Sequence, residues 1–246
     1  MTFHNLEKRV TELGLEEEYL ELFDKLKLPT KHALAYLLDI GALLEENGLK
    51  NSYAVFGGYA VLTQLMRVLG PKIALTWRGS EDIDLYGTER IVGALNGEYK
   101  VVSDNASPNI AKKRTIRLLT REANPEPELK VDFSTRVHDY AINEIDIMGV
   151  PLSVVSPLSL VKGKTHLAVK DEKHLTDVLN LLWILEHDNV SPETTYFGFN
   201  QKQRKELKEV VIKGREMCQP QRIGFTPSMQ YLSDIKKNLD HYGGQE

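Results

Sequence analysis

Residues 78–85 read Arg-Gly-Ser-Glu-Asp-Ile-Asp-Leu and place Asp82 and Asp84 two positions apart. Successive side chains of a β-strand point to opposite faces, so both carboxylates share one face while Ile83 and Leu85 enter the core. Two adjacent carboxylates repel each other unless a cation lies between them. Hard oxygen ligands of this kind suit Mg2+ or Mn2+, which complete their coordination with water and substrate phosphates. The stretch therefore predicts a strand that presents a metal site.

A glycine pair lies upstream of this strand. The apolar run 53–56 meets Gly57-Gly58, and apolar residues then recur at helical spacing from Tyr59 to Leu69. This order predicts a strand, a glycine turn and a helix. Because the first N–H groups of a helix have no intrahelical partner, the start of this helix is suited to bind phosphate.

A third acid follows downstream. Residues 129–133 predict another strand, in which Asp132 faces away from Val131 and Phe133. A strand that lies next to the first one can bring Asp132 to the same metals. We therefore expect three carboxylates at one site.

Helical periodicity dominates both ends of the chain. The N-terminal pattern stops at Pro29, resumes after a cap at Thr30 and ends at Asn47-Gly48. Ser156-Pro157 begins another helix, and further helices are expected over 175–186 and 203–217. Residues 1–50 are predicted to form an N-terminal helical lobe, 51–156 the core that carries the acids, and 157–246 a C-terminal helical lobe.

The middle of the chain carries more strand signals. Residues 115–119 and 129–133 are expected to pair as a hairpin around the turn at 124–127, and one β segment is expected over 145–155. The predicted fold class is α/β (α+β). We expect a small, mixed, twisted sheet with the acids at one edge, flanked by the two helical lobes.

Composition excludes several classes of protein. The chain has 246 residues, 41% hydrophobic and 27% charged, with a formal net charge of -4. This composition is typical of a globular protein. The net negative charge excludes a uniformly basic surface of the kind that coats nucleic acid. The single cysteine, Cys218, excludes an intramolecular disulfide. This cysteine count indicates a reducing, cytoplasmic setting. No stretch reaches the ~18 consecutive apolar residues of a membrane span, so we expect no membrane partner.

The order of glycine turn, Asp-x-Asp strand and later acid resembles the nucleotidyltransferase superfamily, whose fold is that of DNA polymerase beta. The resemblance covers residues 53–133. Within the superfamily, the chain looks most like the AbiEii-type toxins of toxin-antitoxin pairs. Their Gly-Gly-x-Ala turn is matched by residues 57–60, and their Arg-x-Ser/Thr-x-Asp-h-Asp stretch, with h apolar, by 78–84. A lysine and a Lys-Asp-x-x-Asp stretch are matched by Lys164 and 173–177, with His174 in place of the usual acid.

The resemblance implies two-metal nucleotidyl transfer from a nucleoside triphosphate (NTP), with Mg2+ or Mn2+ as cofactor. It implies that three acids are catalytic and bind the metals: Asp82, Asp84 and Asp132. It implies substrate-binding residues in both halves of the chain: Gly57, Gly58, Tyr59, Arg78, Ser80, Lys164 and Asp177. Because Tyr59 follows the glycines where many superfamily members have a serine, backbone amides are expected to hold more of the phosphate.

Several alternatives stay open. Arg78 could instead pair with Glu81 or Asp82, and Lys164 could be a surface lysine. The resemblance implies an RNA acceptor, with tRNA as the leading candidate, and an antitoxin partner. Basic residues in 112–121 and 202–213 could guide RNA or could form solvated faces. A catalytically silent binding protein of the same fold and a small-molecule (antibiotic-type) nucleotidyltransferase are the competing functions.

Overall fold

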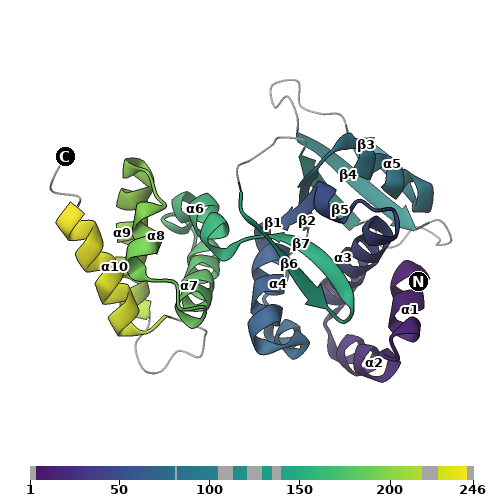
Figure 1. Ribbon diagram of the computed structural model, residues 1–246, viewed down its shortest axis with the longest axis horizontal. Coiled ribbons are helices and arrows are strands. Elements are labelled where there is room, and N and C mark those ends of the chain that lie inside the picture. The colour runs from purple at the N-terminus through teal and green to yellow at the C-terminus, as the bar shows by residue number, and fades with distance from the viewer. Residues whose placement is uncertain are drawn as a thin grey trace. The chain divides into compact units, whose positions relative to one another are not determined.

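A computed structural model describes residues 4–80, 82–104, 113–120, 129–134, 140–217 and 227–242. The chain divides into two compact units, Met1–Val155 and Ser156–Glu246. The first unit contains the sheet, and helices make up the second (Figure 1).

Seven strands form the sheet of the first unit. They are β1 (Tyr53–Phe56), β2 (Asp82–Gly87), β3 (Tyr99–Asp104), β4 (Lys113–Thr120), β5 (Leu129–Ser134), β6 (Ile142–Ile147) and β7 (Val150–Val155). Within the described residues their order is β3-β4-β5-β2-β1-β7-β6. The β2–β5 and β1–β7 pairs are parallel and the other pairs are antiparallel. The predicted mixed α/β fold is thus confirmed.

The first unit also contains helices. They are α1 (His4–Glu12), α2 (Glu16–Lys25), α3 (Leu28–Glu46), α4 (Gly57–Leu69) and α5 (Glu89–Glu98), with short 3-10 turns η1 (Lys50–Ser52) and η2 (Pro71–Thr76). Helix α3 contacts β2, β5 and β7, whereas α4 contacts β1, β2, β6 and β7 (Figure 1). The residues of β2 and β5 that alternate with the acids are fully buried: Ile83, Leu85, Val131 and Phe133.

The acid-bearing strands lie inside the sheet. The expectation that the acids stand at one edge is wrong, because β2 and β5 are neighbours in the middle of the strand order. The predicted pairing of 115–119 with 129–133 is confirmed by the antiparallel β4–β5 ladder. The predicted turn at 124–127 lies outside the described residues.

Two local predictions are corrected. The helix cap predicted at Thr30 is wrong, since α3 begins at Leu28 and Pro29 occupies its first turn, where a missing N–H costs nothing. The single β segment predicted over 145–155 is a hairpin of β6 and β7. Its turn residues, Met148 and Gly149, have φ angles of 54° and 77°, as two-residue hairpin turns require.

The second unit is helical. Its elements are α6 (Pro157–Ala168), α7 (Glu172–His187), α8 (Pro192–Phe197), α9 (Gln201–Met217) and α10 (Met229–Tyr242). The predicted start of α6 is confirmed, because the Ser156 side chain accepts a hydrogen bond from the backbone N–H of Ser159. No helix in the described part of the chain has the length and apolar character needed to span a membrane.

Candidate functional site

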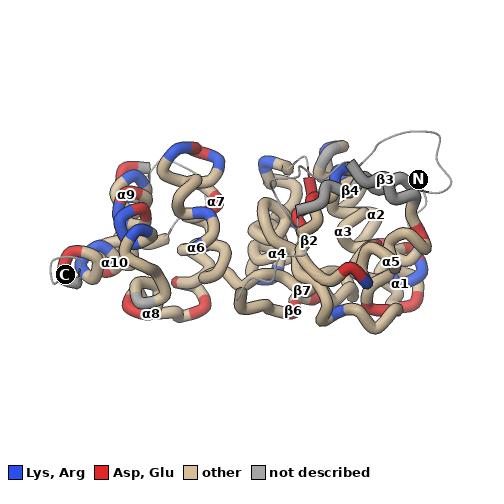
Figure 2. Tube along the Cα trace, turned by 90° about the horizontal axis from the view of Figure 1, so that it is seen from above, with Lys and Arg blue, Asp and Glu red and all other residues tan. Residues whose placement is uncertain are grey.

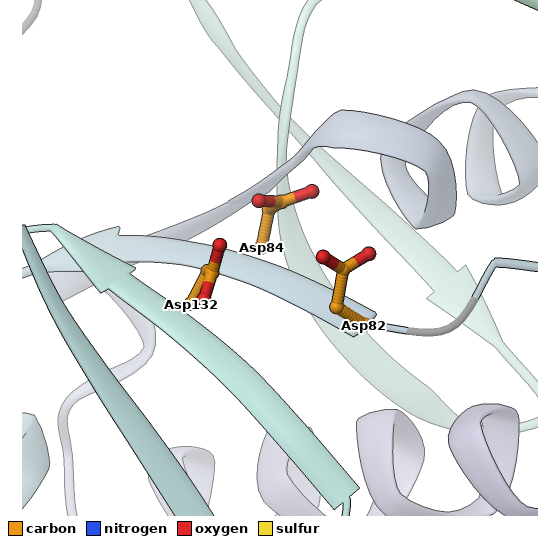
Figure 3. A group of neighbouring side chains, drawn as sticks. All are labelled: Asp82, Asp84 and Asp132. Carbon is orange, nitrogen blue, oxygen red and sulfur yellow. The ribbon is translucent and has the colours of Figure 1, made fainter. Parts of the chain in front are cut away.

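Three aspartates converge on one side of the sheet. One carboxylate oxygen from each of Asp82, Asp84 and Asp132 lies within 4.8 Å of the other two. Figure 3 shows the side chains rising from β2 and β5 on the same side of the strands. The parallel register explains the convergence, since Asp84 is paired with Asp132 across the two strands. The structure therefore brings together the three acids that the sequence placed on two separate strands.

Burial and hydrogen bonding distinguish the three acids. Asp132 is 6% exposed, whereas Asp82 and Asp84 are half-buried. The hydroxyl of Ser80 donates a hydrogen bond to Oδ1 of Asp82 at 3.2 Å. Ser80 thus orients one of the acids.

A lysine that the sequence analysis did not single out lies among these carboxylates. The Nζ atom of Lys130 is 3.3 Å from Oδ1 of Asp132 and 3.5 Å from Oδ2 of Asp82. Burial by itself lowers the pKa of this ammonium, but the attraction of the two carboxylates outweighs burial and raises the pKa. A signal existed in the sequence, because Lys130 shares a strand face with Asp132.

The turn at Gly57 and Gly58 lies directly against β2, the strand that carries Asp82 and Asp84. Phe56 is paired with Asp84 across β1 and β2, so α4 begins beside the Asp84 carboxylate. Gly57 has a φ of 71°, and a Cβ atom added there would lie 1.8 Å from Oδ2 of Asp84. Only glycine meets both conditions. The helix has no side-chain cap at Phe56, which suits its first N–H groups to an anion.

The next two residues contact the segment before β2. A Cβ atom at Gly58 would lie 3.0 Å from Oγ of Ser80 and 3.8 Å from Nη2 of Arg78. Tyr59 is fully buried, and its hydroxyl donates to the carbonyl oxygen of Ser80 at 3.3 Å. Burial raises the pKa of this phenol, so it stays neutral. Tyr59 therefore supports the Ser80 segment with its side chain and can offer a ligand only its backbone.

Arg78 is exposed at the entrance to β2. Its guanidinium carbon lies 4.8 Å from the centre of the Trp77 ring, and Nη1 donates to the carbonyl oxygen of Gly79 at 2.8 Å. The stacking holds the guanidinium near the glycine turn. The alternative partner Glu81 lies outside the described residues.

The remaining two predicted site residues form a pair inside the second unit. Nζ of Lys164 lies 2.9 Å from Oδ2 of Asp177, and the two side chains are 9% and 0% exposed. The alternative of a surface lysine is therefore wrong. Nδ1 of His174 lies 4.0 Å from the same Asp177 oxygen. Burial, and then the Lys164 ammonium, lower the pKa of this imidazole.

Side chains are described for only one of the two basic stretches, residues 202–213. Basic and acidic residues alternate along helix α9, as the blue and red segments of the tube in Figure 2 show, so the helix is not purely basic. The side chains of 112–121 lie outside the described part of the chain.

Comparisons with known proteins support the fold. No protein-family model matches the chain, and no curated protein matches it. Among solved structures, an antigenic nucleotidyltransferase-like protein from Paracoccidioides brasiliensis matches with a TM-score of 0.52 at 14% identity, over 74% of this chain and 88% of the other. JHP933 from Helicobacter pylori matches with a TM-score of 0.47 at 13% identity, over 88% and 92%. A putative nucleotidyltransferase from H. pylori matches with a TM-score of 0.42 at 13% identity, over 84% and 94%. The first likeness shows that the chain has a nucleotidyltransferase-like fold.

Proposed function

We propose that the protein is a metal-dependent nucleotidyltransferase that moves a nucleoside monophosphate from an NTP to an acceptor hydroxyl. One observation carries the proposal. The three clustered carboxylates of β2 and β5 lie beside an uncapped, glycine-initiated helix start, so a cation site and a phosphate site adjoin each other.

The donor set fits Mg2+ or Mn2+. Three carboxylates provide hard oxygen ligands, and Gly57 leaves room for the Asp84 carboxylate that any larger residue would displace. Asp82, Asp84 and Asp132 would hold the metal. Two divalent cations in such a site lower the pKa of an attacking hydroxyl and neutralise the charge that develops on the α-phosphate.

The chain itself would bind and orient the nucleotide. The backbone N–H groups of Gly58 and Tyr59 would donate to phosphate oxygens, and the helix dipole favours that negative charge. Arg78 would add a charged fork to the same phosphates. Ser80 already donates to Asp82, so its role is to position this acid as well as to contact phosphate.

Lys164 and Asp177 are proposed as the nucleotide-binding pair of the second unit. Asp177 is fully buried and holds the Lys164 ammonium at 2.9 Å. A lysine fixed in this way offers a point charge to a phosphate with little further loss of side-chain entropy.

RNA, with tRNA as the first candidate, is the proposed acceptor, and the proposed setting is cytoplasmic, with an antitoxin as protein partner. The acceptor and the antitoxin depend on the resemblance of residues 57–60 and 78–84 to AbiEii-type toxins, and the setting depends on the single cysteine. Transfer of labelled nucleotide to RNA tests the acceptor.

A catalytically silent binding protein of the same fold is the second candidate. One observation favours it, since the ammonium of Lys130 already compensates two of the carboxylates. A nucleotidyltransferase that modifies a small molecule is the third candidate, and nucleotide binding without labelling of RNA would favour it.

The test is a labelling reaction. Purified protein is incubated with total RNA, Mg2+ or Mn2+, and each α-labelled NTP in turn. Asp84→Asn serves as the inactive variant. Glu144→Gln is the matched control, because it removes one negative charge from β6, an edge strand that is separated from β2 by two other strands. We expect wild type and Glu144→Gln to label RNA and Asp84→Asn not to label it. Nucleotide binding without any label would favour a non-RNA acceptor, and no nucleotide binding would favour the silent protein.

A further inference from the structure

Four charged residues form a square on one face of the sheet. The parallel register pairs Asp82 with Lys130 and Asp84 with Asp132. Within each strand the two residues are separated by one buried apolar residue, so all four side chains emerge on the same face. The square contains three carboxylates and one ammonium.

The ammonium lies where the carboxylates need a positive charge. Nζ of Lys130 is within 3.5 Å of an oxygen from Asp82 and within 3.3 Å of one from Asp132. These are two of the three acids whose oxygens cluster within 4.8 Å. A divalent cation held by the same oxygens would be repelled by an ammonium at this distance.

We propose that Lys130 is an internal counter-ion that stabilises the metal-free carboxylate cluster, is displaced when a divalent cation binds, and so weakens the affinity of the site for metal. The proposal rests on the metal site of the proposed function. It makes Lys130 a residue that determines the concentration of free divalent cation at which the carboxylate site is filled.

The surroundings of Lys130 permit this displacement. Its side chain is 50% exposed, so the ammonium can move into water on its flexible stem. The Lys164 side chain gives the contrast, because it is 9% exposed and paired with a fully buried carboxylate. When a doubly charged ion takes its place, the Lys130 ammonium can move into water, whereas the Lys164 ammonium would be left buried and unpaired.

The experiment measures binding of Mn2+ alone by isothermal titration calorimetry. Lys130→Met keeps the length of the side chain and removes its charge, and Lys130→Arg keeps the charge. Lys72→Met is the matched control, since Lys72 is also an exposed lysine that is paired with a carboxylate, that of Glu21, at 3.0 Å. We expect the Kd for Mn2+ to fall about tenfold in Lys130→Met and to stay near the wild-type value in the two other variants.

Thermal unfolding provides a second readout. In EDTA, Lys130→Met should unfold at a lower temperature than wild type, because Asp82 and Asp132 then lose the Lys130 ammonium. Mn2+ should raise the unfolding temperature of Lys130→Met by more than that of wild type. If Lys130→Met does not fold in EDTA, Lys130→Gln takes its place in both measurements.

The outcomes separate the two proposals. Equal or weaker Mn2+ binding by Lys130→Met, with wild type binding normally, overturns the role of Lys130 and leaves the metal site standing. No Mn2+ binding by wild type or by Lys130→Met overturns the metal site, and the role of Lys130 with it.

Discussion

Replacing Gly57 by alanine strains the backbone and, at the same time, crowds Asp84 on β2. The residue has a φ of 71°, and the new Cβ would lie 1.8 Å from Oδ2, 2.6 Å from Cγ and 2.9 Å from Cβ of Asp84. Rotation of the Asp84 side chain about its Cα–Cβ bond can relieve the first two contacts. It cannot relieve the third, so β2 itself must move.

Two terms set the size of the effect. A non-glycine residue with this backbone conformation costs about 1–2 kcal/mol, and crowding of a packed site costs about 1–3 kcal/mol more. We therefore expect Gly57→Ala to lower the free energy of unfolding by about 2–5 kcal/mol. Because Asp84 must shift, we also expect the Kd for Mn2+ to rise at least tenfold, to roughly the extent that a lost ligand contact would cause.

Gly48 offers a matched control. It has a φ of 66°, but a Cβ atom there would meet nothing within 4 Å. The free energy of unfolding of Gly48→Ala should therefore fall only by the cost of the backbone conformation, about 1–2 kcal/mol. This variant should bind Mn2+ with the same Kd as wild type. Urea unfolding followed by circular dichroism gives the free energies, and calorimetry gives the Kd. Equal destabilisation by the two substitutions, together with unchanged Mn2+ binding by Gly57→Ala, would refute the contact between the glycine turn and Asp84.

Three other predictions concern charge. Lys164→Met leaves the fully buried Asp177 without this partner and should destabilise the protein by about 3 kcal/mol in urea unfolding; a loss below about 1 kcal/mol would contradict the pair's structural role. Because burial and then Lys164 lower the pKa of His174 from 6.5, the unfolded chain takes up a proton there first, so the free energy of unfolding should fall as pH drops below 6.5. His174→Gln should flatten that fall, and an unaltered pH profile would speak against it. Removal of Mg2+ by EDTA should lower the unfolding temperature of wild type but not of Asp84→Asn, and equal shifts would place the stabilising cation elsewhere.

Much of the site could be predicted from strand alternation. Ile83 and Val131 are apolar neighbours of acids, so the faces of Asp82, Asp84 and Asp132 follow from the two-residue period, and each apolar neighbour is fully buried. The pairing of β2 with β5 could not be predicted in the same way. A parallel pair needs a long connection, and β3 and β4 intervene between the two strands.

Lys130 was missed for the same reason. Its face was readable from its position two residues before Asp132, but its importance depends on the register that sets it opposite Asp82. Register is a tertiary property that the local pattern of residues 129–133 does not contain.

Local geometry accounts for the other misses. Helix α5 contains Gly93 and Gly97, which are poor helix formers and weaken the helical signal of its sequence. The hairpin between β6 and β7 turns at Met148, a residue type that rarely adopts positive φ. In each case the tertiary packing outweighs the local preference.

The most direct test of the central claim is anomalous diffraction from crystals grown with Mn2+ and a non-hydrolysable NTP. The account predicts a manganese peak within about 2.2 Å of oxygens from Asp82, Asp84 and Asp132, with phosphate oxygens on the same ion. An ordered nucleotide without manganese at these carboxylates, or manganese bound only elsewhere, would contradict it.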